Sequence, residues 1–290
     1  ELAPFAGAVP TIEALVTLPF TADLFVRNLP LGLFFILAVS GLSIVGVVMA
    51  GWGSDNKYAL LGGARAAAQL ISYEVPLILS VLAVVMFTGS MNLHEIVGGQ
   101  GSVPSIAWQP LAFFIFAIAG LAELYRQPFD IPVAESEVVG GPFVEYSGIR
   151  WSMFQLSEYV SLILISILGS LIFLGGWNWP LGNEVGIWLQ IPLMLIKTSM
   201  FVLIFFIARA SLPRLRIDQL MSFAWQVLIP FAFLQLILNG FVLIYDLPHW
   251  TLGLMSGAAT IAAIYLTYRS GQQAASEPYS ARYQTVRSEN

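Results

Sequence analysis

Long apolar runs, separated by shorter polar segments, make up most of this chain. Because an α-helix rises about 1.5 Å per residue, roughly 20 apolar residues cross a bilayer. The pattern predicts eight membrane spans, at residues 2–20, 31–52, 66–88, 109–125, 152–175, 186–208, 222–245 and 250–268. The first span is the weakest, because Pro4, Pro10 and Glu13 interrupt it. Since backbone hydrogen bonds in lipid must close within each segment, we predict an all-α polytopic transmembrane helix bundle over residues 1–268, followed by a polar tail at 269–290.

The composition supports this class of protein. Hydrophobic residues make up 58% of the chain, charged residues 10%, and the mean hydropathy is +0.80, far from the balance of a soluble domain. The lack of cysteine excludes disulfides and thiolate-bound iron–sulfur clusters, and the distant His94 and His249 do not predict a metal site. A net charge of −5 without a basic stripe argues against nucleic-acid binding. Because Glu1 lies partway into an apolar run, we expect a further span before it.

The basic residues gather on one side of the predicted membrane. If the spans alternate, the loops 53–65, 126–151 and 209–221 share a side with the tail. That side carries ten of the twelve basic residues, namely Lys57, Arg65, Arg126, Arg150, Arg209, Arg214, Arg216, Arg269, Arg282 and Arg287. The positive-inside rule therefore predicts that these loops and the C-terminus face the cytoplasm, or the matrix of an organelle.

Three carboxylates inside the predicted spans are candidates for proton chemistry. They are Glu74, Glu123 and Glu158. A charged carboxylate at mid-bilayer costs about 2.5–3.5 kcal/mol, so such a group is usually neutral, paired or in contact with water. The alternative is a glutamate that reaches the membrane surface from a helix end. This alternative weighs most for Glu123, and we prefer it for Glu13.

Residues 126–150 form the most highly charged loop. It contains four carboxylates and two arginines, namely Asp130, Glu135, Glu137, Glu145, Arg126 and Arg150. Pro128 and Pro132 exclude a regular helix over its first part. The two arginines are available as partners for the acids. Three aromatic residues, Phe129, Phe143 and Tyr146, alternate with the charges, which favours a docking surface or an amphipathic cavity over a solvated connector.

Four segments resemble a known family. They are GWGSDNKYALLGGARAAAQLISYEVPL (51–77), RQPFDIPVAESEVVGGPFVEYSG (126–148), FLGGW (173–177) and RASLPRLRIDQLMSFAW (209–225). In this order, and over about residues 2–245, the chain is similar to the membrane subunit that closes the quinone site of respiratory complex I. This family is called subunit 1 of NADH dehydrogenase in mitochondria and the H subunit of NADH-quinone oxidoreductase in bacteria, and the bacterial members look closer.

The resemblance implies a proton-translocating NADH:quinone oxidoreductase that is catalytic only as a complex. Ubiquinone or menaquinone would be the substrate at a subunit interface, and the partners would be hydrophilic quinone-module subunits, small and antiporter-like membrane subunits, and lipid. Proton coupling would fall on Glu74, Asp130, Glu135, Glu137, Glu145 and Glu158. The quinone tunnel would be lined or braced by Arg65, Arg126, Phe129, Phe143, Tyr146 and Arg209. Two departures stand out, because many members carry an acid at the position of Val133 and some carry Glu at that of Gly41.

Other functions compete with this one. The equivalent subunit of a membrane-bound energy-converting hydrogenase shares the acidic loop but uses no quinone. An ion-coupled transporter also contains buried glutamates, although no internal repeat is visible here. A structural anchor would tolerate glutamine in place of Glu135, Glu137 and Glu145 without loss of turnover.

Overall fold

A computed structural model describes residues 1–101, 103–133, 135–179 and 186–276, and every regular element in these ranges is helical. The longer helices are α1 (Ala3–Ala14), α2 (Gly32–Gly41), α3 (Ser43–Gly53), α4 (Lys57–Thr88), α7 (Pro110–Glu123), α9 (Ile149–Phe173), α10 (Ile187–Ser211), α12 (Ile229–Ile244) and α13 (His249–Ser276). Short helices lie between them, namely η1 (Leu15–Thr17), α5 (Leu93–Gly99), α6 (Ser105–Trp108), α8 (Glu135–Val138), η2 (Gly141–Phe143), α11 (Ile217–Phe223) and the π-helical η3 (Ala224–Leu228).

Each of the eight predicted spans coincides with a helical segment. Six segments are long and apolar enough to cross a membrane, namely Gly32–Gly53, Lys57–Thr88, Ile149–Phe173, Trp188–Ser211, Ile217–Ile244 and His249–Thr267. The other two, Ala3–Thr17 and Pro110–Glu123, are shorter apolar helices. The prediction of an all-α polytopic membrane bundle is therefore confirmed.

Two predicted boundaries are displaced. Helix α4 begins at Lys57 rather than residue 66, because the Asn56 side chain accepts a hydrogen bond from the Tyr58 amide and caps the first turn. Arg65 consequently lies within α4 and not in a loop. Helix α13 continues to Ser276, into the segment predicted as a polar tail, and the rest of that tail (277–290) lies outside the described residues.

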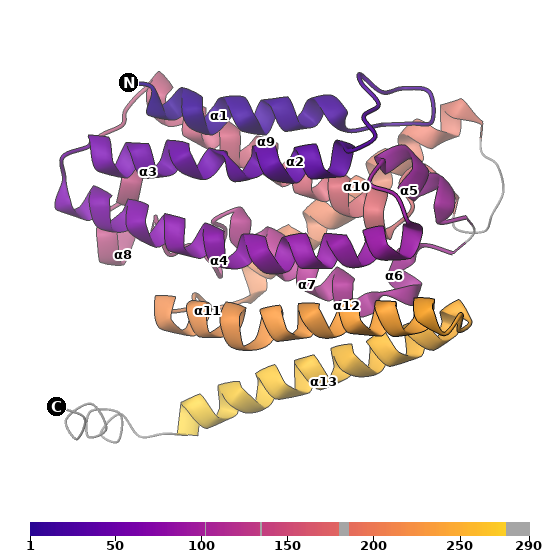
Figure 1. The fold of residues 1–290 in the computed structure, drawn as a ribbon. Coiled ribbons are helices and arrows are strands. Elements are labelled where there is room, and N and C mark those ends of the chain that lie inside the picture. The colour runs from indigo at the N-terminus through magenta and orange to yellow at the C-terminus, as the bar shows by residue number, and fades with distance from the viewer. Residues whose placement is uncertain (102, 134, 180–185, 277–290) are drawn as a thin grey trace.

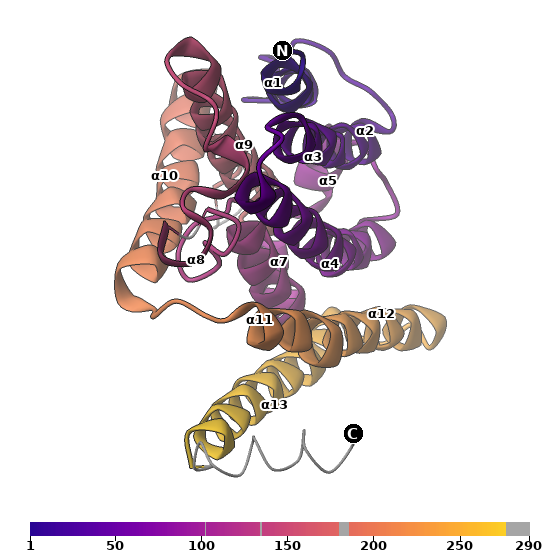
Figure 2. The same cartoon turned by 90° about the vertical axis from the view of Figure 1, so that its left-hand side faces the viewer.

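Helix α4 lies in the middle of the bundle and packs against α3, α7 and α12. Figure 1 shows α1, α2–α3, α4 and α11–α12 as successive layers, with α13 crossing at an angle on the outside. Figure 2, viewed from the end that carries α8, shows α9 and α10 on one flank. The core contains large buried side chains such as Tyr73, Phe116, Phe173 and Phe201.

The segments that carry most of the charge meet at one end of the bundle. The α3–α4 turn, the loop between α7 and α9 and the α10–α11 turn all lie at the left of Figure 1. The opposite end carries α5, α6 and the α12–α13 turn. The candidate site is therefore assembled where helices from distant parts of the sequence end together.

Two spans have interrupted helical hydrogen bonding. The second span is divided into α2 and α3 at Leu42, where amides bond three residues back, as in Leu42 to Val39 and Val45 to Leu42, both at 3.1 Å. In the seventh span, the π-helical η3 ends two residues before Pro230, which has no amide hydrogen to offer the preceding turn. The first of these interruptions lies beside the candidate site.

Candidate functional site

A cavity lined by acidic and hydroxyl groups lies inside the bundle, near its charged end. Its volume is about 40 Å³, counted as the space that the centre of a water molecule can occupy. Its polar lining comes from α3, the end of α7, the following loop and α9, through the side chains of Ser43, Glu123, Tyr125, Ser157, Glu158 and Ser161. One buried water needs about 10–15 Å³ on this scale, so the cavity has room for a few water molecules.

Glu158 faces the cavity from α9 and forms an ion pair with Arg126. The Glu158 Oε2 and Arg126 Nη2 atoms are 3.7 Å apart, and both side chains are only 15% exposed. The Arg126 guanidinium also lies 4.8 Å from the centre of the Tyr159 ring, which adds a cation–π contact. This pairing reduces the cost of holding a carboxylate inside an apolar bundle.

Tyr125 presents its hydroxyl to the same cavity. Its backbone adopts a φ of 49°, a left-handed conformation that is rare for aromatic residues and is held here by the turn after α7. Its hydroxyl oxygen is buried and makes no hydrogen bond among the described residues. The phenol is protonated at neutral pH, so its O–H is available as a donor inside the cavity.

Glu74 continues the acidic series from α4. Its charge interacts with that of Glu123. The carboxylate lies against Gly41, since a Cβ atom at that position would be 2.3 Å from Glu74 Oε1. The interruption between α2 and α3 therefore provides the space that Glu74 occupies. Position 41 thus faces an acid.

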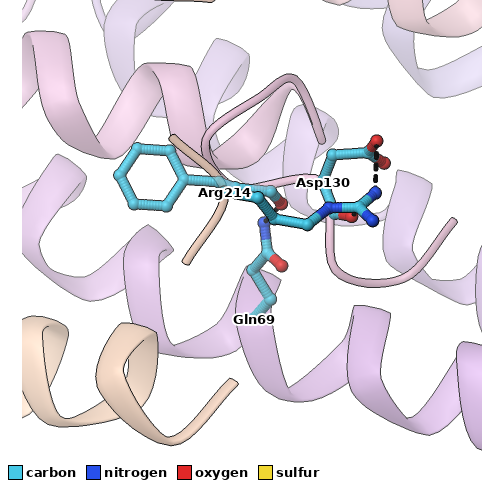
Figure 3. A network of polar contacts seen from close by, with 4 residues as sticks. Gln69, Asp130 and Arg214 are labelled. Atoms are coloured by element: carbon cyan, nitrogen blue, oxygen red, sulfur yellow. Dashed lines mark hydrogen bonds and ion pairs between the residues drawn. The ribbon is translucent and has the colours of Figure 1, made fainter. Parts of the chain in front are cut away.

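Asp130 links this region to the α10–α11 turn (Figure 3). Arg214 Nη2 donates at 2.9 Å to both the Asp130 carboxylate and its backbone carbonyl, and the Leu215 amide donates to Pro128 O at 3.2 Å. Burial raises the pKa of Asp130, while the positive charges of Arg214, Arg126 and Arg209 oppose this shift. Among the loop acids whose side chains are described, Asp130 is the least exposed.

The other loop acids whose side chains are described do not pair with Arg126 or Arg150, the two arginines of the loop that were available as partners. Glu137 pairs with Arg65 of α4 at 2.6 Å, while Glu145 accepts a hydrogen bond from Asn56 Nδ2 at 3.3 Å. Arg150 pairs with Glu1 at 3.2 Å. The Glu137 side chain is 49% exposed, so this pair lies at the surface. The side chain of Glu135 lies outside the described part of the structure.

The aromatic residues of the loop are packed inside. Phe129 stacks on Tyr73 with ring centres 5.5 Å apart, and Phe143 lies 4.6 Å from the Phe154 ring. Tyr146 contacts the same Phe154 ring edge-on at 5.2 Å. These contacts fix the loop on α4 and α9. Arg209, by contrast, is exposed in the last turn of α10.

Two members of the site were not among the sequence candidates. Tyr125 went unnoticed, although a tyrosine next to a glutamate at the end of an apolar span is a usable signal. Arg214 was counted only as one of the basic residues that orient the chain. Glu123, for which a location at a helix end weighed heavily, lines the cavity. Among the described residues, no group of three histidines or acids could hold a metal ion.

Comparison with known proteins identifies the family. The model of a family described as NADH dehydrogenase matches residues 1–240. The chain belongs to this family. Its relatives include the H subunit of the NADH-quinone oxidoreductase of Geobacillus kaustophilus (strain HTA426), 50% identical over 247 residues, which are 83% of this chain and 72% of the relative. The corresponding protein of Brevibacillus brevis (strain 47 / JCM 6285 / NBRC 100599) is 47% identical over 245 residues, 84% and 73% of the two chains.

The resemblance seen in the sequence is therefore confirmed. The part that matches the NADH dehydrogenase family contains the whole cavity, the acidic loop and the α10–α11 turn. Helix α13 lies beyond the matched residues and packs on α12, α7 and α6. The candidate site thus belongs entirely to the shared part of the family.

Proposed function

We propose that this chain is the membrane-embedded H subunit of an NADH:quinone oxidoreductase, and that its cavity couples quinone reduction to proton movement. The relatives carry this name, and the chain is a multi-pass membrane protein of their family. The observation that carries the coupling role is the cavity that brings Glu123, Tyr125 and Glu158 together. Carboxylates in a partly hydrated cavity inside a membrane protein are typical of proton pathways.

The geometry supports a relay from the loop to the middle of the membrane. Arg126 holds Glu158 in place, Tyr125 lines the same cavity, and Glu123 interacts with Glu74. Asp130 lies at the loop end of this series, and its charge acts on Glu158. A change of charge near the loop therefore alters the protonation of the whole group, because coupled acids titrate together.

Quinone supplies the chemistry that this relay would serve, since its reduction takes up two electrons and two protons. The cavity is too small for a quinone ring, because small-molecule sites measure about 300–1,000 Å³. We place the quinone head, of ubiquinone or menaquinone, at the charged end of the bundle, where a hydrophilic partner protein completes the site. Arg65, Arg126, Phe129, Phe143, Tyr146 and Arg209 are the residues assigned to this face. Electrons must come from partner subunits, since the chain has no cysteine for an iron–sulfur cluster.

The remaining assignments follow from this proposal. The loops at the charged end face the cytoplasm, and the chain lies in the plasma membrane of a prokaryotic cell. Small and antiporter-like membrane subunits contact the exposed apolar faces, and residues 1–268 form the membrane domain. The names of the relatives do not favour the hydrogenase or the transporter.

Glutamine variants of the cavity acids test the proposal. We expect Glu123→Gln and Glu158→Gln, each in the complete enzyme, to lower the number of protons moved per electron in sealed vesicles. Glu13→Gln is the control, because Glu13 is a carboxylate of an apolar helix that does not line the cavity and is exposed. Undiminished proton movement in a Glu123→Gln, Glu158→Gln double variant would contradict the proposed role.

A further inference from the structure

A single buried amide joins the two parts of the site. Gln69 of α4 is 2% exposed, and its Nε2 donates to Ala122 O at 2.9 Å and to Phe129 O at 2.8 Å. Figure 3 shows Gln69 beneath the loop that carries Asp130. Both N–H groups of the amide are used in this way, so that it bridges two backbone carbonyls that are seven positions apart in the sequence.

The two carbonyls mark the limits of the functional turn. Ala122 directly precedes Glu123, and Phe129 directly precedes Asp130. Tyr125, with its left-handed backbone, lies between them. The position of the cavity acid relative to the loop acid is therefore set at both ends by one side chain.

We propose that Gln69 is a positioning residue, which holds the cavity acids and the loop at the spacing that coupling requires by bridging the carbonyls of Ala122 and Phe129. This role rests on the proposed function. Without the bridge, the loop keeps its contacts with α4, α9 and the α10–α11 turn but loses its direct hydrogen-bonded link to the end of α7. The loop face assigned to the quinone and the cavity assigned to proton transfer then lose their fixed separation.

The chain contains a matched control for this bridge. Gln100 also directs a buried Nε2 to two carbonyls, those of Leu171 at 2.9 Å and Ile172 at 2.7 Å. This second bridge lies at the other end of α9, away from the cavity and the loop. The two glutamines thus make the same kind of contact in different places, and only one of them touches the proposed site.

The test compares Gln69→Met with Gln100→Met in the complete enzyme in native membranes. Methionine has a similar length and volume but donates no hydrogen bond. We expect Gln69→Met to raise the KM for a short-chain quinone on the order of tenfold. This factor corresponds to the free energy of about one buried hydrogen bond. The number of protons moved per electron should also fall. Gln100→Met should lose similar thermal stability while both values stay within about twofold of the wild type.

Each outcome decides the role of Gln69. Gln69 acts only as a structural contact if the two variants change KM and protons per electron equally. The same conclusion follows if Gln69→Met keeps the wild-type values of both. If Gln69→Met does not assemble, Gln69→Asn replaces it, because this amide is one methylene shorter and cannot reach both carbonyls, and wild-type values there would overturn the proposal. Glu123→Gln is measured in parallel. If that variant moves protons normally, the proposed function fails, whereas a defect in Glu123→Gln without one in Gln69→Met removes only the positioning role.

Discussion

Replacing Gly41 by alanine should displace the Glu74 carboxylate while leaving the fold intact. The new Cβ atom would lie 2.3 Å from Glu74 Oε1 and 3.3 Å from Cδ, whereas ordinary contact begins at 3.4 Å. The oxygen must therefore move by about 1 Å, and it can, because it is the far end of a flexible side chain. Alanine stabilises a helix by roughly 0.5–1 kcal/mol relative to glycine, so we expect the stability to change by no more than about 1 kcal/mol.

The displaced carboxylate should impair turnover much more than folding. A misplacement of about 1 Å in a reacting group can lower a rate by as much as about 100-fold. We expect Gly41→Ala to lower coupled quinone reduction by roughly tenfold to 100-fold. The assay is NADH-driven quinone reduction with proton uptake in sealed vesicles, normalised to the amount of assembled enzyme on a native gel.

A second glycine of the same span provides the control. A Cβ atom at Gly46 would lie 2.3 Å from the backbone nitrogen of Gly7 and 2.6 Å from its Cα, and this backbone has no room to yield. Gly46→Ala should therefore separate α3 from α1 and reduce assembly itself. If Gly41 acts through the Glu74 carboxylate, the Gly41→Ala, Glu74→Gln double variant should lose no more coupled turnover than Glu74→Gln alone. Full coupled turnover in Gly41→Ala, or additive losses in the double variant, would refute this reasoning.

Three further variants probe the loop. Arg214→Gln removes a positive charge that lowers the pKa of Asp130, so this carboxyl should stay protonated to a higher pH. The acidic limb of the pH profile of quinone reduction should therefore move to higher pH. This shift should be absent when Asp130→Asn is also present. Glu137→Gln breaks an exposed ion pair, so thermal unfolding should change by only about 0–1 kcal/mol while protons per electron fall. Phe154→Ala removes a buried ring that packs on Phe143. This change should lower the free energy of unfolding by about 3–5 kcal/mol and speed proteolysis of residues 126–148.

The sequence predicts the spans well because their signal is local. The length of an apolar run, judged against the thickness of a bilayer, placed a helical segment at each of the eight predicted positions. The start of α4 was displaced because the capping by Asn56 outweighs the polarity of the residues that follow. Helix ends depend on a few specific contacts, whereas the existence of a span depends on the sum of many residues.

The partners of the charged groups could not be predicted in this way. Arg126 was available to the loop acids near it in sequence, but it pairs with Glu158, which is 32 positions away. Glu137 is instead paired with Arg65 of α4. Such pairs depend on how helices pack together and on where their ends meet. The types of residues in the site are therefore visible in the sequence, but their assignment to a buried cavity or to the surface is not.

Two carboxylates of the site lie where the helical backbone is interrupted, whereas Glu158 lies within the continuous helix α9. Glu74 faces Gly41 at the interruption between α2 and α3, and Glu123 is the last residue of α7. Irregular backbone at membrane depth is tolerated only where it is buried in protein or lines a cavity. A carboxylate at mid-bilayer would cost about 2.5–3.5 kcal/mol, and backbone groups freed at an interruption reduce this cost. The interruptions and the acids thus depend on each other. A variant that closes such an interruption should therefore affect proton movement before it affects the fold.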